Sequence, residues 1–439
     1  MKIFKHWKAH VVFSLLPLIM LVLISSDATG ANRITLQPVL NVSEEYDDNI
    51  FLDKENRKSD YITTASPGII LNIDSEKNGL SLDYAPTWVW YHKYSGKDTV
   101  RHRGTFNFWQ GFGKHLKFNL RDSYLKSEDI LETFEPGQAS QLLTHTRRPY
   151  QRNDARASLD YQFGPENYFT AGYRHNFIKR DDPLFYDTVE HGPFATLSYW
   201  FTKADGVEFS YSFTRYEYEY DQGPDSTDDF DGHQAGGRYI HRFGPHTKAY
   251  INYQFTARSS KEGPDEYDYK VHNGRIGVAH DFSSKTSAVL ECGYYRPEEK
   301  AEDAGSGMSY SASLTRRIEH GNITLAAERG WDEGFLDVEP RGFTRYSSAS
   351  AKIDYTIWKD LDAYAGISYR KNKYFFEEED DETYTGQCGI RLKILRWLSV
   401  GLNYTRRDRR SDYPIYEYTD NRVMITFSAR HPDGFRWIF

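Results

Sequence analysis

The chain has 439 residues, a formal net charge of −8 and a mean hydropathy of −0.72, yet 16% of its residues are aromatic. With only 39% hydrophobic residues, a soluble protein of this length would have trouble filling one core. A membrane β-barrel has no such difficulty, because its outer face meets lipid, its inner face meets water, and its interfacial girdles use many aromatic residues.

Residues 1–31 are expected to be a cleaved secretory signal. Three lysines fall within the first eight residues, an apolar run covers residues 11–24, and small residues follow. This order is typical of secretory signals. A signal anchor that holds a periplasmic domain is the alternative, but the run is short for a spanning helix. We therefore expect residues 32–439 to form a single outer-membrane β-barrel without a plug domain.

The first hairpin after the signal carries a motif. Residues 46–52 read Tyr-Asp-Asp-Asn-Ile-Phe-Leu, residues 60–62 Asp-Tyr-Ile, and residues 66–69 Ser-Pro-Gly-Ile. This pattern resembles the opening of a family of outer-membrane β-barrel porins that often accompany exopolysaccharide gene clusters. The resemblance implies a role in polysaccharide export. Asp47, Asp48 and Asn49 are interpreted as a solvated loop that caps the hairpin, with ligand binding as the alternative.

Apolar and polar residues alternate with a period of two along the mature chain, which predicts strands with one lipid-facing and one lumen-facing side. One segment has its apolar residues at Leu80, Leu82, Tyr84, Trp88 and Trp90. Similar segments lie at residues 116–120, 155–163, 207–213, 249–255, 361–367 and 423–427. The predicted fold class is all-β, a single transmembrane antiparallel up-and-down β-barrel. A soluble β-propeller or sandwich is the alternative.

The connections between these segments alternate in length. Nine are short and rich in turn residues, at 75–78, 111–115, 164–167, 203–206, 244–247, 283–285, 319–322, 358–360 and 395–397. The others are longer and acidic, around 47–59, 128–148, 180–190, 219–231, 260–266, 297–304, 332–340, 375–382 and 408–416. Outer-membrane barrels have short periplasmic turns and long extracellular loops. Nine short turns predict about 20 strands (18–22), with both termini in the periplasm.

Two loops carry strong charge. Residues 377–382 are six consecutive carboxylates, interpreted as a self-repelling solvated loop, although such a cluster could also hold Ca²⁺ or Mg²⁺ beside lipopolysaccharide. Four arginines near another loop could contact lipid phosphates or an acidic glycan, or form a solubilising rim; they are Arg406, Arg407, Arg409 and Arg410. A loop of residues 128–148 that folded inward would narrow the pore.

The chain ends in an alternating aromatic run, Phe435, Trp437 and Phe439. An aromatic C-terminus resembles the signal that delivers outer-membrane barrels to their assembly machinery. Residues 432–434, Pro-Asp-Gly, interrupt this run and depart from the family's usual ending. The last ordinary wall strand is therefore predicted at residues 422–430, and Phe439 is expected to tail off at the periplasmic rim.

Lumen-lining residues are expected at the positions opposite the apolar stripes. The basic candidates are Lys117, Arg121, Arg156, Arg174, Arg238, Arg275, Lys352, Arg391, Lys393 and Arg422, together with Lys248, Arg317 and Arg370. The acidic candidates are Asp83, Asp160, Glu208, Asp281, Glu291, Glu328, Asp354 and Asp362. Thirteen basic against eight acidic positions predict a mildly basic lumen. Such a lumen favours anionic solutes, or else the charges pair across strands and only stiffen the wall.

No catalytic signature points to an enzyme. The sequence has no Gly-x-Ser-x-Gly elbow, no phosphate-binding glycine loop, no His-Glu-x-x-His and no Cys-x-x-Cys-His. His175, His191 and His233 are interpreted as polar wall residues. Cys292 and Cys388 fall on lipid-facing positions of non-adjacent strands, so they are expected to be small apolar residues rather than a disulfide. No cofactor and no metal ion is expected.

The leading functional hypothesis is an outer-membrane porin that exports an extracellular polysaccharide, anionic or neutral. A barrel of 16 or more strands leaves an aqueous channel wide enough for an extended chain. A general solute-diffusion porin and a sleeve for a periplasmic partner, such as an electron-transfer protein, are the alternatives. The expected partners are outer-membrane lipid and lipopolysaccharide, the polysaccharide and the barrel-assembly machinery, without nucleic acid.

Overall fold

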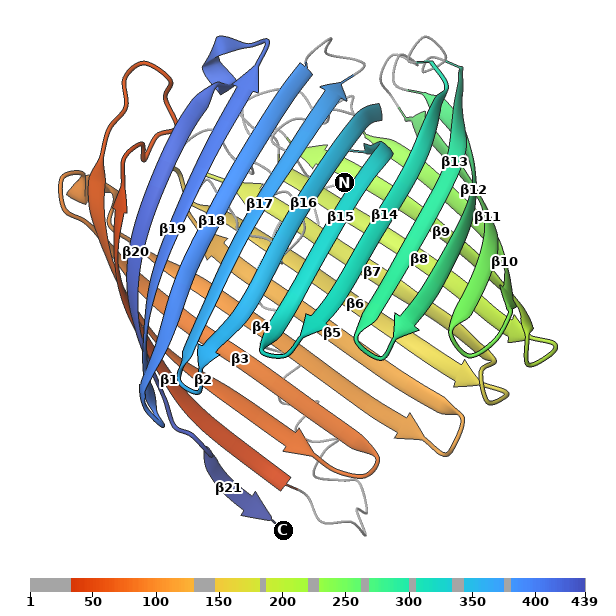
Figure 1. Ribbon diagram of the computed structural model, residues 1–439, viewed down its shortest axis with the longest axis horizontal. Coiled ribbons are helices and arrows are strands. Elements are labelled where there is room, and N and C mark those ends of the chain that lie inside the picture. Colours follow the sequence, from red (N-terminus) through yellow and green to blue (C-terminus); the bar gives the residue numbers. More distant parts are fainter. Residues whose placement is uncertain are drawn as a thin grey trace, which may run out of the picture.

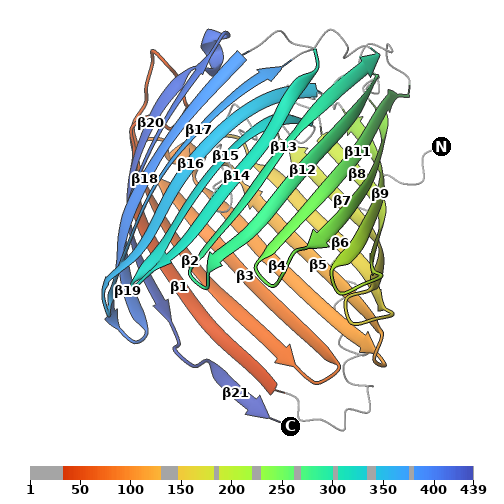
Figure 2. The same ribbon diagram turned by 45° about the vertical axis from the view of Figure 1, so that its right-hand side comes forward.

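The strands of the chain close into one barrel. The computed structural model describes residues 33–129, 147–181, 187–219, 229–261, 268–299, 305–333, 343–374 and 380–438. These residues form a single antiparallel sheet of 21 strands, in which β1 pairs with both β2 and β20 (Figure 1, Figure 2). The expected signal, residues 1–31, lies outside the described residues. Among the described residues, no helix has the length and apolarity needed to span a membrane.

Twenty long strands make up the described wall, which confirms the predicted up-and-down topology and strand number. Two short 3-10 helices, η1 (Ser95–Lys97) and η4 (Pro414–Tyr416), lie between strands. The strands are β1 (Arg33–Asp47), β2 (Asp60–Asp74), β3 (Asn78–Tyr91), β4 (Thr99–Phe112), β5 (Leu116–Ser127), β6 (Tyr150–Gln162), β7 (Tyr168–Arg180), β8 (Asp187–Trp200), β9 (Asp205–Glu219), β10 (Phe230–Arg242), β11 (Thr247–Ser260), β12 (Tyr269–Ser283), β13 (Thr286–Glu299), β14 (Gly307–Ile318), β15 (Gly321–Glu333), β16 (Phe343–Trp358), β17 (Leu361–Tyr374), β18 (Asp380–Leu395), β19 (Leu398–Ser411), β20 (Tyr418–Arg430) and β21 (Phe435–Ile438).

The nine predicted short connections all join neighbouring strands at one end of the barrel, at the bottom of Figure 1. Each spans two to five residues, from the turn between β12 and β13 to the turn between β6 and β7. We call this the short-turn end and the opposite end the long-loop end. Parts of seven long loops lie outside the described residues. They include residues 130–146 of the loop 128–148, which would narrow the pore if it folded inward.

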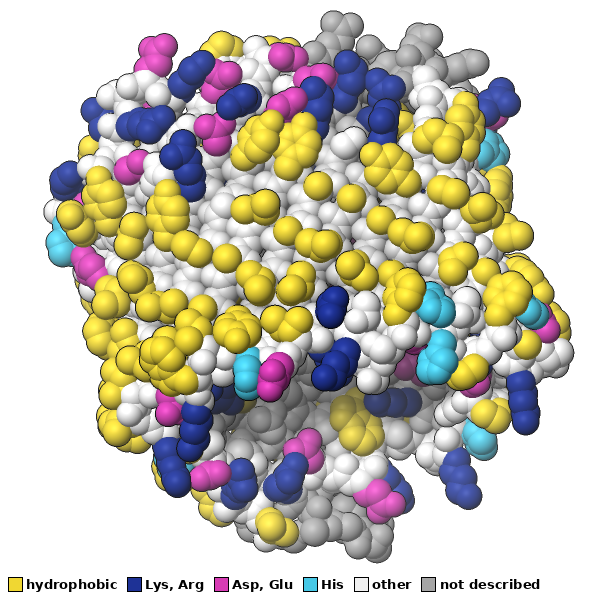
Figure 3. All heavy atoms as spheres, in the orientation of Figure 1, with side chains coloured by type: hydrophobic (Ala, Val, Ile, Leu, Met, Phe, Trp, Pro, Cys, Tyr) yellow, Lys and Arg dark blue, Asp and Glu magenta, His cyan; other side chains and the backbone are white. Residues whose placement is uncertain are grey.

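The predicted apolar stripes face outward. Leu159, Phe209, Ile251, Ile276 and Ile367 are all exposed large hydrophobic residues on the outer face. Figure 3 shows such side chains in a broad band across the wall, with charged side chains gathered above and below it. Cys292 and Cys388 are exposed free cysteines on β13 and β18, as expected from their alternation with lumen-facing residues. An apolar band of this kind suits contact with lipid acyl chains.

Glycines opposite aromatic residues shape the inner wall. At six lumen-facing glycines, an added Cβ would overlap the aromatic ring directly opposite on the neighbouring strand. The pairs are Gly79 with Trp109, Gly172 with Phe194, Gly206 with Trp200, Gly277 with Tyr250, Gly307 with Tyr295, and Gly389 with Tyr364. Each ring therefore lies against the wall rather than across the lumen. Such cross-strand aromatic–glycine pairs also help to fix strand register.

Replacing Gly277 with valine is expected to displace the Tyr250 ring, whose hydroxyl hydrogen-bonds Glu291. The expected loss is about 1–3 kcal/mol of the free energy of unfolding, typical of overpacking. Urea titration of the reconstituted barrel, followed by tryptophan fluorescence, measures it. Gly274→Val is the matched control on the same strand, because a Cβ at Gly274 meets no atom within 4 Å. Equal stability of the two variants would contradict the expectation.

The barrel closes at a seam between its first and last strands. β1 pairs with β20 over residues 39–47 and with β21 over residues 33–36. Between β20 and β21 the chain turns at Gly434, whose φ of +66° suits glycine. Gln37 donates from Nε2 to the carbonyl of His431 at 2.5 Å and thereby ties this break to β1. Wall pairing therefore extends beyond the predicted strand 422–430 to Ile438, while Phe439 lies outside the described residues.

Candidate functional site in the barrel lumen

All ten predicted lumen residues lie on strands, at positions that alternate with the outward apolar stripe. Six of them have an acidic partner: Arg174 with Glu190 at 4.0 Å, Arg238 with Glu208 at 3.5 Å, Arg275 with Glu291 at 3.6 Å, Lys352 with Asp354 at 3.0 Å, Lys393 with Asp362 at 3.5 Å, and Arg422 with Asp420 at 2.9 Å. Within the described part of the chain, the other four make no ion pair; they are Lys117, Arg121, Arg156 and Arg391. Cross-strand pairing thus accounts for only part of the basic lumen.

Three of the ten residues form a row on one wall. Arg121 of β5 lies directly opposite Arg156 of β6, which lies directly opposite Arg174 of β7. Arg121 and Arg156 are exposed to the lumen, and each is near the middle of its strand. Like charges placed directly opposite each other destabilise a strand pair. We call these three residues the arginine row.

The surroundings of the row leave its charge largely uncompensated. The Arg156 guanidinium lies 4.3 Å from the ring centre of Phe194, which supports a cation without neutralising it. Glu190, beside Arg174, also accepts a hydrogen bond from Asn176 at 2.5 Å. The Nε of Arg174 is buried without an acceptor. The row therefore presents cationic hydrogen-bond donors to the lumen.

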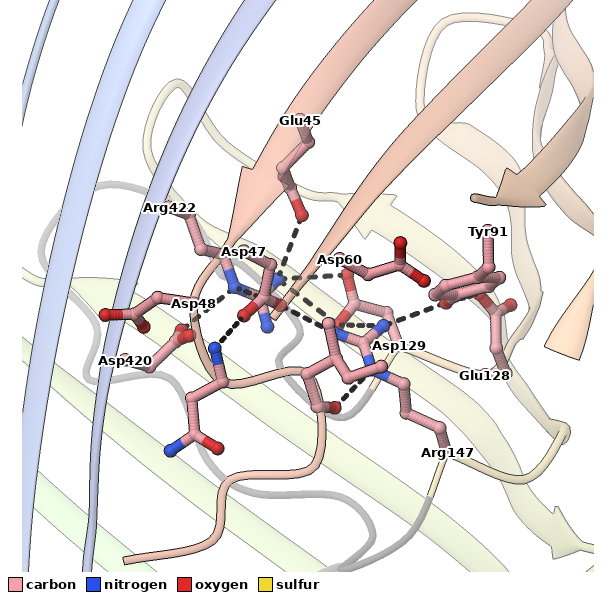
Figure 4. Close-up of polar contacts among 12 residues, drawn as sticks. Glu45, Asp47, Asp48, Asp60, Tyr91, Glu128, Asp129, Arg147, Asp420 and Arg422 are labelled. Carbon is pink, nitrogen blue, oxygen red and sulfur yellow. Dashed lines mark hydrogen bonds and ion pairs between the residues drawn. The ribbon is translucent and has the colours of Figure 1, made fainter. Parts of the chain in front are cut away.

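At the long-loop end, a buried network joins the wall to the segment around Arg147 (Figure 4). Arg147 is fully buried and donates to the carbonyl of Ile50 at 2.5 Å, to the hydroxyl of Tyr91 at 2.9 Å and to Asp47 at 2.9 Å. Desolvation by burial lowers the pKa of Arg147, but Asp129 and the other partners raise it above its ordinary value. Arg147 therefore stays charged and holds its end of the 128–148 loop inside the rim.

The same network crosses the seam. Arg422 of β20 contacts Asp420 at 2.9 Å, Asp47 at 3.4 Å and Asp129 at 3.4 Å. Asp48 accepts hydrogen bonds from the backbone and side-chain nitrogens of Asn421 at 2.8 and 2.7 Å. Asp47 and Asn49 are completely buried, so the interpretation of this turn as a solvated loop is wrong. The turn instead connects β1 to β20 through hydrogen bonds and ion pairs. The residues that form them lie far apart in the sequence and meet where the barrel closes.

Three carboxylates of this network lie close enough to hold a metal ion. Oxygens of Asp47, Asp48 and Asp420 lie within 4.8 Å of one another. Asp47 already pairs with Arg147 and Arg422, and Asp420 with Arg422. The guanidinium groups of Arg147 and Arg422 thus supply the positive charge beside Asp47 and Asp420 that a metal ion would otherwise provide.

A second buried network lies at the same end, on β17, β18 and β19. Asp381 accepts hydrogen bonds from Arg409 at 2.8 Å, Asn372 at 2.9 Å and Tyr374 at 3.1 Å. The six carboxylates at 377–382 therefore do not all form a solvated loop: residues 380–382 begin β18, and Asp381 is buried. The four arginines on β19 divide likewise, since Arg407 and Arg409 are buried whereas Arg406 and Arg410 are exposed on the outer face.

Residues 204–431 match the family described as "Putative beta-barrel porin 2", which covers more than half of the chain. The chain belongs to this family. It is an outer-membrane β-barrel porin, in agreement with the predicted compartment and fold class. In such barrels the short-turn end faces the periplasm and the long-loop end faces the cell exterior.

The porin resembles solved outer-membrane proteins at low sequence identity. It is 10% identical to OccK2 (OpdF) of Pseudomonas aeruginosa, solved in complex with glucuronate, covering 90% of this chain and 98% of that chain with a TM-score of 0.44. It is 10% identical to OccAB4 of Acinetobacter baumannii, covering 92% and 99%, with a TM-score of 0.43. The siderophore receptor PirA of P. aeruginosa is 8% identical, with 90% and 80% covered and a TM-score of 0.52. The likeness to PirA concerns the barrel fold alone. No curated protein sequence matches the chain.

Proposed function

We propose that this porin is a conduit for the export of an extracellular polysaccharide. The observation that carries the proposal is a row of small residues, mostly hydroxyl-bearing, on the lumen face of β14 to β18. In register, these residues are Ser313, Ala326, Ser350, Ser368 and Thr385. Hydroxyl groups both donate and accept hydrogen bonds, so this wall offers exchangeable partners to the hydroxyls of a passing sugar chain. We call these five residues the hydroxyl row.

The size of the side chains supports the same proposal. Small residues in the hydroxyl row and rings laid against the opposing glycines leave room in the lumen. A barrel of about 20 strands already encloses an aqueous channel. The motif in residues 46–69 adds its resemblance to porins that accompany exopolysaccharide gene clusters.

Deleting the gene is expected to abolish surface polysaccharide, which chemical assay of the washed cell surface measures. Restoring the wild-type gene should restore the polymer, and Ser350→Trp should restore it poorly because the indole projects into the lumen. Ala351→Trp is the matched control, since residue 351 faces outward on the same strand. Unchanged surface polysaccharide in the deletion strain would refute export. Reduced uptake of small solutes would then favour a diffusion porin, and loss of a periplasmic partner's activity would favour a sleeve.

A further inference from the structure

The charge of the wall that carries the arginine row differs from that of the whole protein. On β4 to β7, eight lumen-facing residues are basic and two are acidic. The basic residues are Arg101, Arg103, Lys117, Arg121, Arg152, Arg156, Arg174 and Arg180, and the acidic ones are Asp154 and Asp160. The chain as a whole carries a net charge of −8. The basic excess is therefore a local property of this wall.

The few acidic groups nearby do not neutralise the row. Asp160 accepts hydrogen bonds from Asn119 at 2.6 Å and from Thr170 at 2.7 Å, so its oxygens are directed to neutral donors. Arg101 is paired with Glu128 at 2.6 Å near the extracellular end, away from the row. Among the described residues, Arg121 and Arg156 have no acidic partner. In the ranges that the structure describes, the three guanidinium groups of the row have a single acidic partner, Glu190 beside Arg174. They therefore repel one another, and an anion bound there relieves this repulsion.

The position of the row suits a polymer that moves along the lumen. Neighbouring strands lie about 4.8 Å apart, so the three arginines span about 10 Å across the strands. Because barrel strands tilt by about 35–45° from the barrel axis, this row also climbs along the axis. As a polymer with repeated anionic groups advances, each anionic group can leave one guanidinium and bind the next one along the row.

The opposite wall supplies complementary contacts. β6, at the centre of the arginine row, and β16, at the centre of the hydroxyl row, lie ten strands apart in a wall of twenty, and therefore face each other across the barrel (Figure 1). One wall thus presents cations that bind carboxylates in a bidentate manner, and the other presents hydroxyls. Sugar acids carry both carboxylates and hydroxyls.

We propose that the exported polymer is a carboxylate-bearing polysaccharide, and that Arg121, Arg156 and Arg174 bind its carboxylates during passage. This inference rests on the proposed export function and names its substrate class. The three arginines determine specificity between acidic and neutral polymers. Binding of the carboxylates by these arginines is non-covalent.

Planar-bilayer recording of the purified porin tests the inference directly, with oligogalacturonate as the acidic probe and maltooligosaccharide of the same length as the neutral one. The acidic oligomer should interrupt the wild-type current at a concentration at least tenfold lower than the neutral oligomer. Arg121→Gln/Arg156→Gln/Arg174→Gln should remove this preference and lower the permeability for chloride relative to potassium. The triple Lys variant, which keeps the charge, should retain the chloride preference and part of the acidic block.

A matched control removes three basic residues from the outer face. Lys371, Lys373 and Arg410 lie in exposed ion pairs with Glu382, Asp380 and Asp408, so replacing all three by glutamine should leave block and ion selectivity unchanged. Open-channel current from each variant shows that it has folded. Equal block by acidic and neutral oligomers in the wild type would overturn the inference.

Complementation of the deletion strain separates the two proposals. If deletion abolishes the polymer and the triple Gln variant restores it at the wild-type rate, export stands but the carboxylate-binding row is refuted. If deletion leaves the polymer unchanged, export itself is refuted, and the inference falls with it. Export of an acidic polymer that falls at least fivefold with the triple Gln variant, and remains unchanged with the outer-face control, supports both.

Discussion

Arg147→Met is expected to lower the free energy of unfolding by about 3–5 kcal/mol, because it removes one of the two guanidinium groups that compensate the buried carboxylate of Asp47. Arg147 is completely buried and joins Asp47 of β1, Tyr91 of β3 and the carbonyl of Ile50. Its removal therefore weakens three parts of the extracellular rim at once. Urea titration of the barrel in lipid vesicles measures the change.

Arg57→Met is the control for this substitution, since Arg57 is exposed in the first loop. It should change the free energy of unfolding by less than about 0.5 kcal/mol. The double variant Arg147→Met/Asp47→Asn should lose less than the sum of the two single variants, because Asp47 and Arg147 interact directly and the double variant removes both charges of the pair. A loss below about 1 kcal/mol for Arg147→Met would contradict the role assigned to the network.

Asp381→Leu is expected to cost about 3–5 kcal/mol of the free energy of unfolding as well, because it removes one partner of a buried ion pair. Arg409, Asn372 and Tyr374 all donate to this one carboxylate. Replacing it takes the acceptor that these three donors share away from the extracellular end of the wall. The same urea titration in vesicles measures the loss.

The neighbouring residue provides the comparison. Glu382 faces outward and pairs with Lys371 at 2.9 Å, with the two side chains 29% and 43% exposed. Exposed ion pairs contribute about 0–1 kcal/mol, so Glu382→Gln should leave stability nearly unchanged. If the two substitutions had equal effects, strand alternation would not divide this carboxylate run into a buried and an exposed part.

The wall was predictable from the sequence because its signals are local. The alternation that places Phe209 and Ile251 outward and the nine short turns each depend on a few consecutive residues. The pairing of Arg156 with Arg174 follows in the same way from the turn between β6 and β7. Pairing of Arg121 with Arg156 instead depends on how the long connection after β5 sets the register, which no local pattern specifies.

The rim networks were not predictable, because they join residues that only the closed barrel brings together. Asp48 and Asn421 lie 373 residues apart in sequence, and Arg147 and Asp47 lie 100 apart. A run of Asp and Asn between two strands has the composition of a solvated turn. Its burial depends on arginines contributed from elsewhere, and no pattern within the motif indicates them.

The seam constrains the order of events during folding. Each of the other wall strands joins its predecessor across a single connection, whereas Gln37 and Arg430 at the seam lie 393 residues apart. The entropic cost of closing a loop grows with its length, and such non-local pairings form slowly. We therefore expect an open sheet to form first and ring closure to be the last and slowest step. Until then the edge of β1 is unpaired and prone to aggregation, so the barrel needs protection at its N-terminal strand until its C-terminal strands have been synthesised.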